Sequence, residues 1–292
     1  MLTRCRSCVV MLTVLASCTG PRDAGRDVAA NVAGHSPAGQ SSPGVANTVT
    51  VVATDYAFQS PAAVPAGLTT VQLVNHGHEV HMMGLIKLED GKSISQLMTF
   101  LTQDKPQPAW AVDMGGANAV SPGDTSNATV ILSPGHYLLI CWIPAADGSI
   151  HFMKGMQLPL EVTAARTAAV AEPAADVVVR LADYHIDWPG PIAAGTHTFR
   201  VENDGPQEHD VTVLEVAPGK SPAEAIAWFT NPAKGAPAGR ARGGIVGIPH
   251  GTHGFFTGTF HRGQYIFLCF VPDERDGKPH FMHGMERVFT VE

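Results

Sequence analysis

Short runs of alternating apolar and polar residues recur along residues 48–163 and again along residues 176–292. Alternation of this kind, bounded by glycine and proline turns, is typical of half-buried β-strands. The runs that we interpret as strands are Thr48–Thr54, Thr70–Val74, Thr129–Leu132, Tyr137–Cys141, Leu158–Val162, Val177–Leu181, Thr198–Glu202, Val211–Val216, Gly254–Phe260, Tyr265–Phe270 and Val288–Val291. Several short strands at close spacing predict an all-β chain built of two tandem Greek-key β-sandwiches.

Two segments depart from the strand pattern. Ser93–Leu101 and Ser221–Phe229 each begin with a serine, which is a frequent helix cap, and carry apolar residues at helical spacing. We therefore expect one short helix inserted between the strands of each half.

The two halves are copies of one another. The residue pairs that lie 128 positions apart include Tyr56 and Tyr184, Gly67 and Gly195, Asn75 and Asn203, His81 and His209, Gly135 and Gly263, and Cys141 and Cys269. Beyond the cysteines the offset becomes 129, so one residue has been inserted in the second copy. A repeat of this length indicates a duplicated domain. We expect a first domain at 48–163, an alanine-rich linker at 164–175 and a second domain at 176–292.

The first 47 residues have a different composition from the repeats. Arg4 and Arg6 precede an apolar run that is too short to span a bilayer, which predicts an export signal at residues 1–18. The signal ends in Leu-Ala-Ser-Cys, which resembles the lipobox of bacterial lipoproteins and implies acylation of Cys18. Residues 19–47 are rich in Gly, Ala, Ser and Pro, so we expect a flexible tether.

The composition agrees with an all-β protein and narrows the class of partner. Only 15% of the residues are charged and 45% are apolar, with 30 glycines and 22 prolines, which favours many turns over long charged helices. The formal net charge is −7 and no basic run occurs, which argues against nucleic acid as a partner.

Cysteine use points to metal chemistry. Cys5, Cys8 and Cys18 lie in the leader, which leaves Cys141 and Cys269, one in each repeat. No disulfide can form within a domain that has a single cysteine. Two lone thiols in an exported protein are explained by metal ligation.

Each of these cysteines opens a segment that carries further metal ligands. Cys141 is followed by His151 and Met156, and Cys269 is followed by His280 and Met285. A thiolate, an imidazole and a thioether, completed by one more histidine, suit copper that cycles between Cu(I) and Cu(II). Zinc could use the same Cys and His atoms, but a thioether is a poor zinc ligand.

The order of these residues resembles that of the cupredoxins, or blue copper proteins. The matching features are an Asn-x-Gly turn leading to a His, a Gly-x-Tyr strand ending at Cys, a second His, and a Met five positions beyond that His. The long Cys-to-His loops are similar to that of the electron-transfer copper of copper nitrite reductases. The resemblance implies one type 1-like site made of His81, Cys141, His151 and Met156, and another made of His209, Cys269, His280 and Met285.

The match has departures. Many cupredoxins carry an Asn just after the first His, which ties the two ligand loops together. Here that position holds Met82 in the first copy and Asp210 in the second. Either another residue ties the loops, with Asn75 and Asn203 as candidates, or the sites are looser than usual. The loops also contain spare ligands, namely Met153, Met282 and His283.

Other residues have less specific explanations. His76, His78, His250 and His253 could form further metal clusters, but we interpret them as polar turn residues. Tyr56 and Tyr184, with the aspartates before them, are interpreted as structural residues at strand edges. Trp142, Phe152, Phe270 and Phe281 could provide an apolar shell for the sites.

Three hypotheses for the function follow from these patterns. The first is a membrane-anchored copper protein that carries single electrons outside the cytoplasm, with a redox protein as its partner. The second is storage or delivery of copper to an accepting protein, using the same ligands. The third is a metal-free sandwich that binds a partner.

We do not expect an enzyme, because the flanks of both cysteines lack the histidines that hold catalytic copper in two-domain copper oxidases and nitrite reductases. No small-molecule substrate is evident from the sequence. The expected location is the periplasmic face of a bacterial membrane or the cell surface. Thr19 follows the predicted acylated cysteine, where inner-membrane lipoproteins are associated with an Asp, so the outer membrane fits better.

Overall fold

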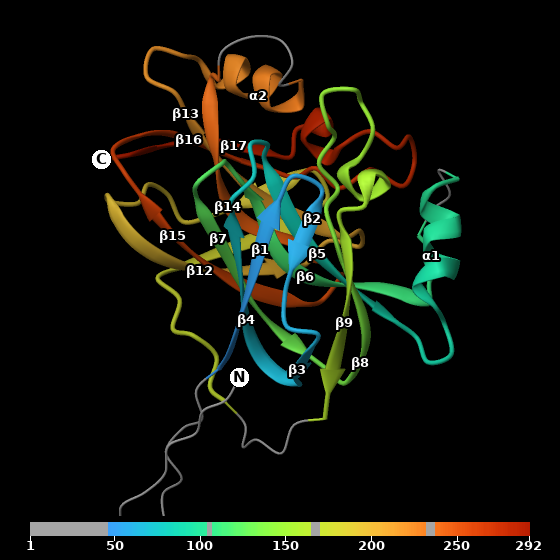
Figure 1. The fold of residues 1–292 in the computed structure, drawn as a ribbon. Coiled ribbons are helices and arrows are strands. Elements are labelled where there is room, and N and C mark those ends of the chain that lie inside the picture. The colour runs from blue at the N-terminus through green and yellow to red at the C-terminus, as the bar shows by residue number, and fades with distance from the viewer. Residues whose placement is uncertain (1–45, 104–106, 165–169, 232–236) are drawn as a thin grey trace, which may run out of the picture. The chain divides into compact units, whose positions relative to one another are not determined.

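The computed structural model describes residues 46–103, 107–164, 170–231 and 237–292 (Figure 1). The strands of the first repeat are β1 (Asn47–Thr54), β2 (Ala57–Gln59), β3 (Ala63–Pro65), β4 (Gly67–Asn75), β5 (His81–Leu88), β6 (Ala111–Val120), β7 (Thr125–Leu132), β8 (Gly135–Ile140) and β9 (Gln157–Thr163). Those of the second are β10 (Val177–Ala182), β11 (His185–Asp187), β12 (Gly195–Asn203), β13 (His209–Val216), β14 (Gly239–Ile248), β15 (His253–Phe260), β16 (Gly263–Leu268) and β17 (Glu286–Val291). The helices are α1 (Ile94–Leu101), α2 (Pro222–Thr230) and two short 3₁₀ turns, η1 (His151–Lys154) and η2 (His280–His283).

The strands form two sheets, and each sheet runs through both repeats. One has the order β11-β10-β12-β15-β7-β4-β1-β2 and the other β17-β16-β13-β14-β6-β5-β8-β9-β3. Residues of both sheets share one buried core, where Leu73 and Leu85 represent the first repeat and Phe199 and Phe267 the second. The chain therefore has a duplicated cupredoxin-like fold, and the expected all-β sandwich class is confirmed.

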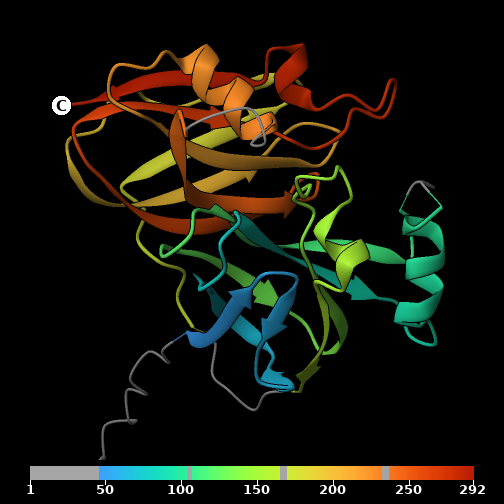
Figure 2. The same ribbon diagram turned by 45° about the horizontal axis from the view of Figure 1, so that its top comes forward.

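The repeats join where β6 meets β14 and β7 meets β15 (Figure 2). Ala117 pairs with Ile245 across the first junction. At the second, the Asn127 side chain exchanges two hydrogen bonds of 2.8 and 2.9 Å with the Thr257 backbone. Our strand predictions missed β5, the short strands β2, β3 and β11, and both β6 and β14. In β6 and β14, two adjacent glycines with positive φ break the apolar alternation.

The two inserted helices are present. Ser93 caps α1 and Ser221 caps α2, both in a full capping box. Leu97 and Leu101 of α1 pack against Leu138, Ile140 and Phe152, so the helix rests on the strand and turn that flank Cys141. Ala225 of α2 likewise lies in a buried cluster with Ile266 and Leu268 of β16, the strand that leads to Cys269. The helix predictions are therefore confirmed, and each helix packs against the strand that leads to a predicted ligand.

The predicted leader, Cys18 and most of the tether lie outside the described residues, and those predictions stay untested. Within the described ranges, no helix has the length and apolar character needed to cross a membrane. Of the predicted linker, Glu172 contacts the second repeat through ion pairs with Arg200 and His253.

Candidate metal centres

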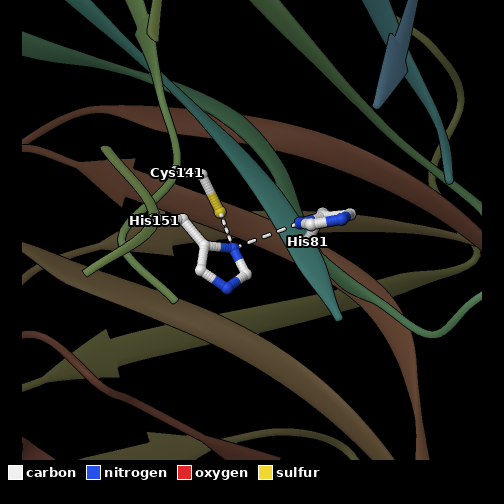
Figure 3. Close-up of side chains that lie close together, drawn as sticks. All are labelled: His81, Cys141 and His151. Carbon is white, nitrogen blue, oxygen red and sulfur yellow. Dashed lines mark hydrogen bonds between the residues drawn. The ribbon is translucent and has the colours of Figure 1, made fainter. Parts of the chain in front are cut away.

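The first centre gathers three residues that are distant in the sequence. His81 begins β5, Cys141 directly follows β8, and His151 begins η1. Their ligand atoms lie within 4.8 Å of one another, and all three side chains are fully buried (Figure 3). His151 Nδ1 is 3.2 Å from His81 Nδ1 and 3.5 Å from Cys141 Sγ. The structure therefore brings together three of the four residues that we predicted for this site.

The second centre repeats this arrangement with His209, Cys269 and His280, again within 4.8 Å and fully buried. His209 Nδ1 is 3.0 Å from His280 Nδ1. Cys269 Sγ lies 3.5 Å from His280 Nδ1 and 3.8 Å from His209 Nδ1. The duplication has preserved the geometry of the donor atoms.

The methionines are tied to these groups through the backbone. The Cys141 amide donates to the Met156 carbonyl at 3.2 Å, and the Met156 amide donates to the His151 carbonyl at 3.1 Å. Cys269, His280 and Met285 make the same two bonds at the same lengths. Met156 and Met285 are both fully buried, whereas the spare candidates Met153 and Met282 are 50% and 59% exposed. This contrast in burial agrees with the choice of Met156 and Met285.

The outer nitrogen of each histidine has its own acceptor. In the first centre, His81 Nε2 lies 3.1 Å from Asp55 Oδ1 and His151 Nε2 lies 2.8 Å from Glu79 Oε2. A carboxylate can only accept a hydrogen bond, so both Nε2 atoms carry the proton and both Nδ1 atoms keep a free lone pair. Two lone pairs and one thiol then converge in a buried space, which suits a shared cation.

The acceptors in the second centre are partly different. His209 Nε2 lies 3.0 Å from Asp183 Oδ1, as in the first repeat, but His280 Nε2 lies 3.3 Å from the amide oxygen of Gln207. Gln207 Nε2 donates to Asp183 at 3.0 Å, which orients the amide so that its oxygen faces the histidine. His280 Nδ1 therefore also turns its lone pair toward Cys269.

Burial shifts the titration of these groups in the direction that metal binding needs. Desolvation lowers the pKa of His81, His151 and His280 and lowers that of His209 to about 4, so the imidazoles are neutral near pH 7. Burial also raises the pKa of the Cys141 thiol to about 12. Because metal ligation requires the thiolate, a bound cation has to supply the missing stabilisation. Two neutral imidazole nitrogens, a cysteine that ionises when a cation binds, and a thioether together fit copper.

Residues after the first histidine hold the cysteine differently in the two centres. In the second repeat, the Asp210 amide donates to Cys269 Sγ at 3.4 Å and the Asp210 carboxyl accepts from the Phe270 amide at 3.0 Å. Burial raises the pKa of Asp210 to about 7, although bonds from Phe270, Cys269 and Asn118 act against the rise. Met82 in the first repeat offers only its backbone amide to Cys141.

Asn75 and Asn203 were our candidates for tying the ligand loops, and the structure places them elsewhere. Asn75 Nδ2 donates to the Glu79 and Val120 carbonyls at 2.8 and 2.9 Å, and Asn203 makes the equivalent bonds to Gln207 and Ile248. They fasten the turn before the first histidine to β6 or β14. In the second repeat Asp210 itself joins the two loops.

Sequence reasoning missed the residues that surround the ligands. Tyr56 has a left-handed φ of 65°, which is rare outside glycine, and its ring lies edge-on to His151 at 5.1 Å. Its hydroxyl donates to Glu79 at 2.8 Å. Tyr184 repeats this conformation beside His280, at 5.5 Å. The repeated Asp-Tyr pairs, and a polar residue two places before each first histidine, were the available signals.

The predicted apolar shell and the remaining histidines have other contacts. Trp142 stacks edge-on against Phe152 at 5.1 Å, and Phe270 lies 5.0 Å from Phe281, so these rings join the ligand loops to the helices. Four of the other histidines have acceptors of their own: His78 binds the second oxygen of Asp55, whose first oxygen accepts from His81, while His250 binds the Gly205 carbonyl, His253 binds Glu172 and His283 binds Asp276.

The comparisons with known proteins returned solved structures only, since no family model and no curated protein matches the chain. Auracyanin from Roseiflexus castenholzii is 21% identical, with a TM-score of 0.28, over 41% of this chain and 99% of its own. The blue copper oxidase of Nitrosomonas europaea is 15% identical, with a TM-score of 0.26, over 85% of this chain and 86% of its own. The copper nitrite reductase of the same organism is 13% identical, with a TM-score of 0.23, over 85% and 94%.

These comparisons correct one expectation. We expected that the chain is not an enzyme, because histidines do not flank Cys141 or Cys269. The solved structures that match more than four fifths of the chain include a blue copper oxidase, a multicopper oxidase and copper nitrite reductases, which are enzymes. The expectation is therefore contradicted and we withdraw it.

Proposed function

We propose that each repeat binds one copper ion in a type 1-like site and that the protein transfers single electrons through these sites. The observation that carries the proposal is the fixed orientation of four imidazoles. An acceptor on every Nε2 turns every Nδ1 toward a buried cysteine. Copper supplies the exchange of one electron between its two oxidation states.

The protein's own residues favour retention of the ion and rapid electron exchange. The ligands come from strand ends and a backbone-bonded loop, and all of their side chains are fully buried. A site held in this way changes little in shape between oxidation states, because the surrounding bonds already fix its donors. Burial also keeps water from adding to the coordination shell.

Metal analysis and visible spectra of three proteins test the proposal: the wild type, Cys141→Ser and Cys269→Ser. We expect two copper ions per chain in the wild type and one in each variant. Each remaining site should show the intense visible band that a copper–thiolate bond produces. Zinc instead of copper, or a wild type that binds no metal, would overturn the proposal.

Copper delivery is the second candidate, and the exposed thioethers favour it. Met153 and Met282 occupy equivalent positions in η1 and η2, beside buried ligand histidines. Soft thioethers at the surface could pass Cu(I) to an acceptor. A Cu(I) chelator distinguishes the candidates, since an electron carrier keeps its copper through repeated oxidation and reduction whereas a delivery protein releases it.

We also propose that the protein works outside the cytoplasm, held to a membrane by lipid on Cys18, with a redox protein as its partner. The short apolar leader and its Leu-Ala-Ser-Cys ending support this placement. Mass spectrometry of the mature N-terminal peptide should find an acylated Cys18. The Cys18→Ala variant should appear in the soluble fraction, and an unmodified Cys18 in the wild type would contradict the anchor.

A further inference from the structure

A side chain of the first repeat ends inside the second. Asn118 lies in β6 and is only 2% exposed. Its amide nitrogen donates to the Val211 carbonyl at 3.0 Å and approaches the Ile245 carbonyl at 3.3 Å, and both carbonyls belong to the second repeat. Its amide oxygen accepts the Ala119 amide at 2.6 Å, which fixes the orientation of the side chain.

The contacts of Asn118 continue to the cysteine of the second centre. Val211 directly follows Asp210, so the Asn118 amide holds the backbone next to Asp210 through the Val211 carbonyl. Asp210 contacts Cys269 Sγ through its backbone amide and the Phe270 amide through its carboxyl. A single side chain of the first repeat thus supports the segment that joins both ligand loops of the second centre.

The positions that correspond to Asn118 and Asp210 cannot give the first centre the same support. By the 128-residue offset, Asn118 corresponds to Val246 and Asp210 corresponds to Met82. Neither of these side chains can form the hydrogen bonds made by Asn118 and Asp210. Among the described residues, the hydrogen bonds recorded for His81, Cys141 and His151 all come from the first repeat.

We propose that Asn118 is a positioning residue for the second metal centre, so that this centre is completed by the first repeat whereas the first centre is self-contained. The expected change in copper binding rests on the proposed function. The hydrogen bonds of Asn118 exist without metal, so their effect on Cys269 can also be tested in the apoprotein. Groups behind metal ligands commonly change metal affinity by about 10–100-fold when they are removed.

The test uses Asn118→Val, which gives this position the residue of its counterpart, and Val246→Ala as the matched control. The first measurement is the rate at which a small thiol reagent modifies each cysteine in the full-length apoprotein, resolved by peptide mass spectrometry. We expect faster modification of Cys269 in Asn118→Val, with Cys141 unchanged. Val246→Ala should change neither cysteine.

The second measurement is copper dissociation from the second centre, isolated by Cys141→Ser. Asn118→Val should accelerate it by about tenfold or more. If Asn118 acts through Asp210, adding Asp210→Ala should leave Asn118→Val with little further effect, because the two changes break one network. A residue that only supports the fold would give additive effects.

The location of the substitution provides an internal control, because Asn118 belongs to the repeat whose metal centre should stay intact. Unchanged Cys269 modification, or equal acceleration at both cysteines, would overturn the inference. If the wild type binds no copper, the proposed function fails, whereas the thiol rates still decide the role of Asn118.

Discussion

The two metal centres share their donor residues but differ in the groups behind them. The acceptor on the second histidine is the Glu79 carboxylate in one repeat and the Gln207 amide in the other. The residue after the first histidine is Met82 in one and Asp210 in the other. In the second repeat the buried Asp273 carboxylate also lies 3.8 Å from Nε2 of His280. Duplication has therefore preserved the ligands and changed which charged groups lie near them and at what distance, and such groups influence the potential of a metal site.

At the junction between the repeats, too, one copy has charged residues where the other has apolar ones. Asp113 of β6 and Glu208, just before β13, contact one another across the junction, and burial raises the pKa of both carboxyls, that of Asp113 to about 6. The corresponding positions on the other side hold Ala241 and Val80. Arg240 and Arg242 of the second repeat also pair with Asp124 of the first. If the two repeats were identical at the junction, each of these contacts would occur twice. The counterpart residues differ, so the two copies now contribute different side chains to the junction.

The largest effect is expected from Gly116→Ala and Gly244→Ala. A Cβ atom at these positions would lie 2.0 Å from the Met83 carbonyl oxygen or 1.8 Å from that of Val211. Each variant should lose about 3 kcal/mol or more of stability and unfold both centres together, because the sheets are shared. Thermal unfolding followed through both copper bands checks this. Loss of one centre alone would show that the repeats fold independently.

Gly91→Ala is the control for these variants. Its φ is also positive, at 80°, but no atom lies within 4 Å of the added Cβ. Backbone strain alone should cost about 1 kcal/mol.

A smaller effect is expected from Asp113→Asn. Burial raises the pKa of Asp113 in the folded state above its ordinary value of 3.8, so folding favours the protonated form. The protein should lose stability as the pH rises from about 4 to above 6, and the variant should lose less. At pH 8 we expect a gain of roughly 1–3 kcal/mol, measured by chemical unfolding. A variant that is less stable than the wild type at pH 8 would contradict this.

The reciprocal exchange of Glu79→Gln and Gln207→Glu sharpens the comparison of the two centres. A carboxylate beside a ligand histidine favours Cu(II), so Glu79→Gln should raise the reduction potential of the first centre. Gln207→Glu should lower that of the second. We expect shifts of tens of millivolts, where about 59 mV equals a tenfold change for one electron.

Potentiometric titration in Cys269→Ser and Cys141→Ser backgrounds measures each centre alone. Shifts of the same sign in both variants would show that the charge of this residue does not control the potential.

The smallest effect is expected from the helix caps, where both repeats keep the same serine. Ser93 and Ser221 each bind the backbone amide of the third helical residue, at 3.2 Å in both cases. Ser93→Ala and Ser221→Ala should each cost about 1 kcal/mol in chemical unfolding. Clearly unequal costs would mean that the two helices differ in more than their caps.

Much of the fold could be predicted because local patterns carry it. Alternation identified β1 and β10, and a serine cap before apolar residues identified α1 and α2. The strands β6 and β14 could not be found in this way. Their paired glycines and small residues gain strand structure only by pairing with each other and with β5 and β13.

The sequence by itself determined the order of donor atoms in each repeat, since cysteine, histidine and methionine follow fixed spacings within one loop. Tertiary structure decided what surrounds them. Glu79 and Gln207 were ordinary turn residues in the sequence, and Asn118 lay in an unrecognised strand. Hydrogen bonds between residues dozens of positions apart have no sequence period, so only the packed sheets bring these groups to the metal ligands.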